Sequence, residues 1–138
     1  MKAEAIFAPV GVLSVWTIFI LFLVAYRRIE AARARRVPRG AFRLGESPDV
    51  PPDVAVVNRN YMNLLESPVL FYVACLVLYA THHVGTGPIV LAWIFVALRL
   101  AHSFIHLTKN RIIPRLVAFA LSNLVLFAMW LWIIVSVF

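Results

Sequence analysis

Seven polar side chains, set within largely apolar stretches of the sequence, are of the types that bind an anion. They are Arg59, Asn63, Glu66, Arg99, His102, His106 and Arg115. The first three are spaced i, i+4, i+7 and the next three i, i+3, i+7, so each trio is expected on one face of a helix. Three arginines outnumber the single carboxylate, and guanidinium groups bind carboxylates through paired hydrogen bonds. The pattern predicts a pocket that holds an anion.

Simpler roles remain open for several of these residues. Arginines near helix ends can extend to lipid headgroups, which would account for Arg59 and Arg115 taken singly. Glu66 is the only acid within the expected membrane spans, so we expect it to pair with Arg99 or Arg59. Such an ion pair between helices could be purely structural, with no ligand.

A metal site is a further alternative for the two histidines. His102 and His106 stand at i, i+4, but only Glu66 is placed to add a third ligand. We therefore predict no metal site. The single cysteine, Cys75, allows no disulfide within the chain and is expected to be a small apolar filler.

The composition places these side chains in a membrane. The chain has 138 residues, of which 63% are hydrophobic and 14% charged, whereas soluble domains carry about 25% charged residues. The net charge is +7, yet seven of the thirteen Lys and Arg residues fall within positions 27–43, between long apolar runs. This basic stretch is expected to set the membrane topology and to contact lipid headgroups, so we predict no nucleic-acid partner.

Runs without Asp, Glu, Lys or Arg define the membrane spans. They cover positions 5–26, 67–98 and 116–138. A crossing needs about 20 residues, so the first and last runs each make one span. Polar residues and glycines before Pro88 divide the middle run into two parts, each too short to cross unless it forms a re-entrant hairpin. Both parts must extend into charged sequence, which brings Glu66 and Arg99 into the bilayer, where ionisable groups usually mark function.

We predict an all-α integral membrane four-helix bundle with up-down-up-down topology and one domain over residues 1–138. The expected spans are about 5–26, 58–80, 88–107 and 114–138, and the basic cytoplasmic loop is 27–57. That loop holds seven arginines, and Lys109 and Arg111 follow the third span, so the positive-inside rule puts both segments in the cytoplasm. Both termini then lie outside the cytoplasm, and a bacterial inner membrane is the expected location.

Three local patterns add detail to this arrangement. Alternating Ala and Arg residues after position 26 are expected to continue the first span as a helix. Trp16 lies mid-span, outside the interfacial belt that the other three tryptophans predict. Pairs of small residues four positions apart let helices approach closely and favour a trimer. These pairs are Ala97 with Ala101 and Ala118 with Ser122.

The ordered set of polar residues resembles the MAPEG family (membrane-associated proteins in eicosanoid and glutathione metabolism). The motifs are Arg59-x3-Asn63-x2-Glu66 in the second span, Arg99-x2-His102-x3-His106 in the third, and Arg115 at the start of the fourth. The resemblance covers essentially the whole chain and is nearest to the microsomal prostaglandin E synthase branch and to short bacterial members. It implies a homotrimer with a glutathione site between neighbouring subunits, open toward the cytoplasm.

The resemblance also implies roles for the polar residues. Arg115 matches the arginine proposed to stabilise the glutathione thiolate, because a cation beside a thiol lowers the pKa of that thiol. The residues that would bind glutathione as co-substrate are Arg59, Asn63, Glu66, Arg99, His102 and His106. The implied function is a glutathione-dependent membrane transferase or peroxidase acting on a lipophilic electrophile or hydroperoxide.

The chain departs from the family pattern at four positions that would contact the ligand. Met62 stands where the family pattern has a second arginine, and His106 stands where it has a tyrosine in the third span. In the fourth span, Phe119 replaces a tyrosine and Leu116 replaces a serine. His106 could still donate a hydrogen bond, whereas Phe119 and Leu116 cannot. The alternative function is therefore a non-catalytic trimeric membrane protein, structural or accessory, with a membrane-protein partner. A proton or ion pathway is a third hypothesis, but no polar track leads to the outer face.

Overall fold

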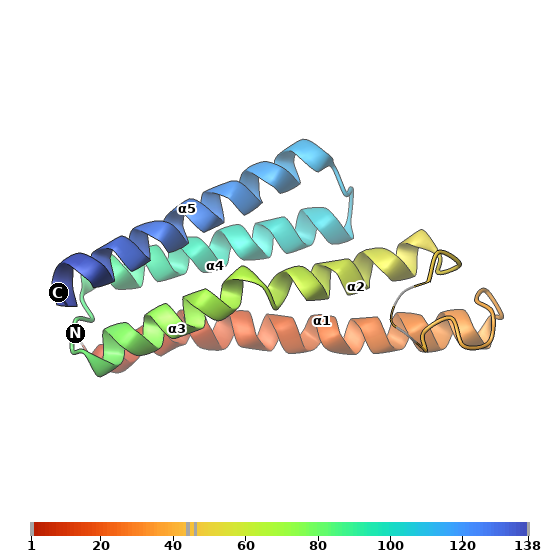
Figure 1. Ribbon diagram of the computed structural model, residues 1–138, viewed down its shortest axis with the longest axis horizontal. Helices are drawn as coiled ribbons and strands as arrows, with labels where there is room; N and C mark the ends of the chain where they lie inside the picture. The colour runs from red at the N-terminus through yellow and green to blue at the C-terminus, as the bar shows by residue number, and fades with distance from the viewer. Residues whose placement is uncertain (1, 44, 46, 138) are drawn as a thin grey trace.

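The computed structural model describes residues 2–43, 45 and 47–137, which form helices joined by loops and turns, with no strand among them. A short 3-10 helix, η1 (Ala3–Ile6), leads into α1 (Phe7–Arg33). The other helices are α2 (Pro52–Leu64), α3 (Ser67–Ala80), α4 (Thr86–Leu107) and α5 (Ile112–Val137) (Figure 1). The all-α prediction is confirmed. Position 138, where the predicted fourth span ends, and positions 44 and 46 of the predicted loop lie outside the described residues.

Four elements of the described chain are long and apolar enough to cross a membrane: Ala3–Arg33, Pro52–Ala80, Thr86–Leu107 and Ile112–Val137. The second of them contains both α2 and α3. Both ends of the chain lie at one end of the bundle, together with the α3–α4 turn, and we call this the terminal end (Figure 1). The α1–α2 loop and the α4–α5 turn lie at the opposite end, the loop end. The predicted four-helix bundle with up-down-up-down topology is confirmed.

The outer surface of the bundle is apolar, as a bilayer requires. Phe22 is 68% exposed and Val135 is 82% exposed. In the interior, Phe71 of α3 stacks on Phe95 of α4 with ring centroids 4.5 Å apart, and both side chains are fully buried. Helices that are apolar all round are typical of membrane spans. Packing contacts of this kind hold such helices together, because lipid tails are as apolar as the side chains.

Both ends of the predicted loop at positions 27–57 are helical. α1 continues to Arg33, which the Ala and Arg pattern predicts, since both residues are strong helix formers. α2 begins at Pro52, whose fixed φ suits the first turn of a helix. The remaining loop, 34–51, is fastened to α2 by hydrogen bonds of 3.2 and 2.6 Å from Arg36 to Asp53. These bonds raise the pKa of Arg36 above its ordinary value, because they favour the charged guanidinium.

A kink separates α2 from α3 within the second membrane element. Pro68 has no N–H to donate to the carbonyl of Leu64, and its ring would clash with that carbonyl in a continuous helix. α2 accordingly ends at Leu64, and Glu66 lies between the helices with φ −89° and ψ −104°. Arg59 and Asn63 share a face of α2. The predicted continuous face of three residues is wrong at Glu66, because that prediction assumed an unbroken helix.

A buried polar junction joins α1, α2 and α4. The Ser103 hydroxyl accepts one hydrogen bond from Trp16 Nε1 at 2.9 Å and another from Asn60 Nδ2 at 2.7 Å. Asn60 and Ser103 are both fully buried. The junction accounts for the mid-span position of Trp16, because a buried indole N–H normally finds an acceptor.

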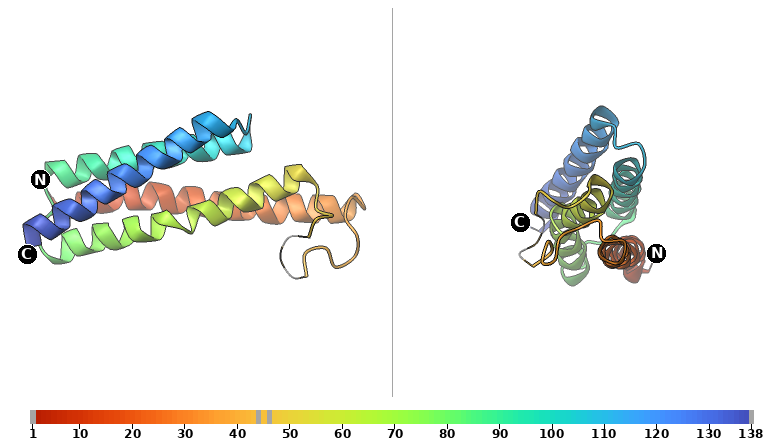
Figure 2. Two further views of the ribbon diagram at one scale, coloured as in Figure 1. Left: turned by 45° about the horizontal axis from the view of Figure 1, so that its top comes forward. Right: turned by 90° about the vertical axis from the view of Figure 1, so that its right-hand side faces the viewer.

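Helix α5 packs against α3 toward the terminal end but diverges from α2 toward the loop end (Figure 2). No Cα atom of α2 lies within 8 Å of a Cα atom of α5. Ala118 and Ser122 of α5 are buried within the chain, so this small-residue pair packs against the chain's own helices and not against a second subunit. Ala97 and Ala101 of α4 are exposed.

Candidate functional site

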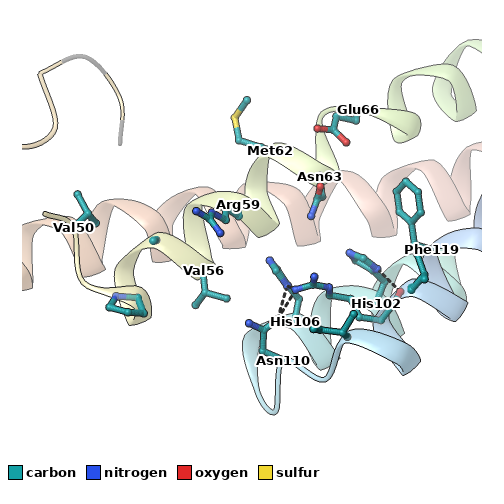
Figure 3. Close-up of a pocket in the computed structure, with 15 residues that line it drawn as sticks. Val50, Val56, Arg59, Met62, Asn63, Glu66, His102, His106, Asn110 and Phe119 are labelled. Carbon is teal, nitrogen blue, oxygen red and sulfur yellow. Dashed lines mark hydrogen bonds between the residues drawn. The ribbon is translucent and has the colours of Figure 1, made fainter. Parts of the chain in front are cut away.

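A cavity of about 690 Å³ occupies the space between α2 and α5, where the two helices diverge. Helix α4 supplies the wall that connects them. Six of the seven predicted site residues line the cavity: Arg59, Asn63, Glu66, His102, His106 and Arg115 (Figure 3). The structure therefore brings together side chains that the sequence distributes over three membrane elements.

The Arg115 guanidinium is held by two neighbours at the α4–α5 turn. Its Nη1 lies 2.8 Å from Nδ1 of His106 and donates to the side-chain oxygen of Asn110, and this oxygen lies 3.0 Å from the same His106 nitrogen. Asn110 has a positive φ of 44°, a conformation that Asn adopts more readily than most residues. Asn110 is not among the site residues predicted from the sequence. An Asn in a short turn between two predicted spans is the only sequence signal that pointed to it.

His102 is oriented by the main chain of α5. Its Nδ1 lies 3.0 Å from the carbonyl oxygen of Arg115. The His102 ring also contacts the ring of Phe119, with centroids 5.7 Å apart, and the His106 ring, with centroids 6.0 Å apart. Both histidines are 4% exposed, and in the described part of the chain neither Nε2 atom has a hydrogen-bond partner. Two buried imidazole nitrogens beside the cavity are therefore left without protein partners.

Arg99 lies behind the cavity wall and is fully buried. Its Nη2 donates to the carbonyl oxygen of Asn63, and its guanidinium carbon lies 5.6 Å from the centre of the Phe119 ring. Asn63 is in the last turn of α2, where carbonyl groups lack partners within the helix. The prediction that Glu66 pairs with Arg99 or Arg59 is wrong for Arg99, because the kink leaves Glu66 exposed and Arg99 binds the freed carbonyl instead. Nε and Nη1 of Arg99 have no partner among the described residues.

The charge around the cavity is predominantly positive. Arg59 and Arg115 line it, Arg99 lies immediately behind it, and Glu66 is the one acid among the described residues of its lining. Removing an arginine from water is costly unless other groups compensate its charge. The arrangement is therefore suited to an anionic ligand.

Apolar side chains line the cavity between these cations. Val56 and Met62 come from α2, and Ile112, Leu116 and Phe119 come from α5 on the opposite side. Leu116 and Ile112 are 58% and 68% exposed, so this side of the cavity continues into the apolar outer surface. The site can accommodate an apolar group beside an anion.

The donor set does not favour a metal. Among the residues that the structure describes, no three His, Cys, Asp or Glu side chains are grouped closely enough to hold a metal ion. The two histidines that line the cavity also have Arg115 beside them.

The fold and the cavity define an integral membrane four-helix bundle with a cationic site between helices. The chain belongs to the MAPEG family, whose family model matches residues 6–135. This confirms the family predicted from the sequence, while its branch stays a prediction. No curated protein and no solved structure matches the chain.

Proposed function

We propose that this protein is a glutathione-dependent membrane transferase or peroxidase, with the glutathione site in the cavity between α2 and α5. The excess of arginine around that cavity is the observation that carries the proposal. Glutathione has two carboxylates, and guanidinium groups bind carboxylates through paired, charge-assisted hydrogen bonds. A cavity of about 690 Å³ is also in the range that holds a small peptide.

Arg115 is the residue that we assign to thiol activation. Free thiols are mostly protonated at neutral pH, and a neighbouring cation increases the thiolate fraction. The contacts with His106 and Asn110 keep the Arg115 guanidinium at the cavity wall. Arg59, Asn63, Glu66 and the α4 residues His102 and His106 are then the proposed contacts of the peptide. Arg99, which lies behind the cavity wall, is proposed to contribute its positive charge and to hold the Asn63 main chain in place.

The second substrate is proposed to be a lipophilic electrophile or hydroperoxide. Met62 of α2 and Leu116 and Phe119 of α5 give the cavity an apolar lining beside its arginines. Because Leu116 also belongs to the exposed apolar surface of α5, an apolar molecule can reach the site from the bilayer. The sulfur nucleophile and its target would then meet inside the cavity, beside Arg115.

We further propose that three copies assemble and that the loop end faces the cytoplasm of a bacterium, where glutathione is available. The many arginines of the α1–α2 loop support this orientation. The missing contact between α2 and α5 leaves one side of the cavity that a neighbouring subunit could cover.

The test uses the purified full-length protein in detergent. Thiolate absorbance is recorded on adding glutathione, followed by the rate of conjugation of an aryl halide. The Arg115→Ala substitution should lower that rate by about tenfold or more, since about 1.4 kcal/mol of lost stabilisation corresponds to tenfold. The matched control is Arg111→Ala, which removes an exposed arginine of the same turn that does not line the cavity. A wild-type protein without a glutathione-dependent signal would contradict the proposal, as would unchanged activity in Arg115→Ala.

The second candidate is a non-catalytic structural or accessory membrane protein on the same scaffold. It is favoured by the cavity positions of Met62, Leu116 and Phe119, which offer no hydroxyl or guanidinium group to a ligand. In that case, the protein should copurify with a stoichiometric membrane-protein partner, and glutathione should cause no shift in its melting temperature.

A further inference from the structure

The hydrogen-bond partner of His102 determines which of its nitrogens carries a hydrogen. Nδ1 lies 3.0 Å from the Arg115 carbonyl oxygen, which can only accept a hydrogen bond. Nδ1 therefore bears the hydrogen. In the neutral imidazole, Nε2 then has a free lone pair and acts as an acceptor.

The contacts of His106 do not single out one nitrogen in the same way. Its Nδ1 lies 2.8 Å from Arg115 Nη1, which can only donate, and 3.0 Å from the Asn110 side-chain oxygen, which can only accept. The first contact requires an acceptor at Nδ1 and the second requires a donor. His102 is thus the histidine of the pair whose hydrogen bond leaves Nε2 as the acceptor.

The free nitrogen of His102 belongs to a side chain that lines the proposed glutathione cavity. The His102 side chain is 4% exposed and lines the cavity, and the stick view shows it on α4, facing Asn63 of α2 across the cavity (Figure 3). Its Nε2 has no hydrogen-bond partner within the described chain. A buried acceptor without a partner costs free energy, so a ligand that donates a hydrogen bond to Nε2 would stabilise the site.

The surrounding charges suit a proton acceptor next to a thiol. Arg59 and Glu66 face the cavity from α2, Arg99 and His106 belong to α4, and Arg115 belongs to α5. The predominance of positive charge favours the thiolate once the thiol proton has moved. Glu66 is a weaker candidate for the acceptor, because it is exposed at the kink between α2 and α3, whereas His102 is buried and its ring is oriented by the main-chain carbonyl of Arg115.

We infer that His102 accepts the thiol proton of the co-substrate in the cavity, an inference that rests on the proposed function. The S–H bond breaks, an N–H bond forms at Nε2, and the sulfur keeps the electron pair. The products are an imidazolium and a thiolate beside Arg115. When the sulfur bonds to the electrophile, Nε2 returns the proton to the atom that leaves with the displaced electron pair, and the imidazole is neutral again.

The stoichiometry of protons distinguishes this mechanism from stabilisation by arginine alone. Glutathione is added to the full-length protein in weakly buffered detergent solution, and thiolate absorbance and proton release to an indicator dye are recorded together. S-methylglutathione, which has no thiol proton, gives the correction for other groups. If His102 takes the proton, thiolate forms with far less than one proton released per thiolate. Release of one proton per thiolate would overturn the inference.

Two variants complete the experiment. His102→Gln should form less thiolate, release one proton for each thiolate that remains, and conjugate an aryl halide about a hundredfold more slowly. Its affinity for glutathione sulfonate, which already carries a negative charge in place of the thiol, should stay within a fewfold of the wild-type value. His83→Gln, in the exposed α3–α4 turn, is the matched control and should behave as wild type.

The outcomes separate the two proposals. Wild-type protein that neither binds glutathione sulfonate nor forms thiolate would overturn the proposed function together with the role of His102. Protein that binds glutathione sulfonate and retains wild-type thiolate yield and rate in His102→Gln would overturn only the role of His102. Should His102→Gln fail to fold, the proton stoichiometry of the wild-type protein still decides.

Discussion

Arg115 contributes to the cavity through both its side chain and its main chain. Its guanidinium donates to Asn110 and contacts Nδ1 of His106, while its carbonyl oxygen accepts from His102. One residue near the start of α5 thus fixes the positions of two α4 histidines. The α4–α5 turn, which carries Asn110, sets the distance between these groups.

We expect Asn110→Gly to slow glutathione conjugation about tenfold, because a hydrogen bond to a charged group contributes about 1.5–3 kcal/mol. Glycine tolerates the positive φ of position 110, so the variant removes the side chain without straining the turn. The measurement is kcat/KM for glutathione with an aryl halide. The adjacent Lys109→Ala, an exposed position outside the cavity lining, is the control. Wild-type activity in Asn110→Gly would show that Asn110 does not position Arg115.

The sequence predicted the residue types of the cavity better than their contacts. The length needed to cross a bilayer places several ionisable groups inside the predicted spans. Because such groups are costly in a membrane, they were predicted to be site residues, and six of the seven predicted residues line one cavity. The hydrogen-bond partners of these residues depend on local backbone geometry, which the spacing of residues along the sequence does not reveal. Arg99 binds the Asn63 carbonyl and not Glu66, because the last turn of α2 leaves that carbonyl free.

At the scale of the helices, the kink at Glu66 sets the course of α2. α3 packs against α5, whereas α2 does not, so the chain changes direction between them. The sequence contains Pro68, but hydropathy and the spacing of polar residues predict a single span over positions 58–80. A proline near the middle of a span should therefore have limited the predicted polar face to Arg59 and Asn63.

We expect Pro68→Ala to straighten the second element and to narrow the cavity. Alanine restores the N–H that can bond to the carbonyl of Leu64 and removes the clash of the proline ring. A straight helix would carry α2 along the course of α3, toward α5. Spin labels at Val56 on α2 and Val117 on α5 should then show a shorter distance by double electron–electron resonance.

The control for this measurement is Pro48→Ala, because Pro48 is an exposed proline of the α1–α2 loop, outside the helices. It should leave the distance between the labels unchanged. An unchanged distance in Pro68→Ala would mean that other contacts, and not the proline, hold the kink.

At the scale of the whole molecule, the order of the helices followed from the sequence. The apolar runs of membrane length, together with the basic stretch after the first run, predict four antiparallel spans. The structure has the four helical elements in the same order. The number of subunits depends on surfaces that hydropathy does not distinguish. Ala118 and Ser122 illustrate this, because they pack inside the chain although their spacing also fits an intersubunit contact.

The orientation in the membrane can be tested with single cysteines. Cys75 is fully buried and is the only cysteine in the sequence, so it should give no background labelling. In intact cells, a membrane-impermeant maleimide should react with His83→Cys at the terminal end. It should react with Arg39→Cys in the α1–α2 loop only after the membrane is permeabilised, since the positive-inside rule puts this loop in the cytoplasm. The reverse pattern would contradict the proposed orientation.

The most direct test of the cationic cavity as a glutathione site is a cryo-electron microscopy map of the purified protein with glutathione sulfonate. We predict a trimer with ligand density between α2 and α5, where Arg59 and Arg115 line the cavity. A map in which a lipid or a helix of another subunit fills that cavity, with no ligand density beside Arg115, would contradict the assignment of the cavity as a glutathione site.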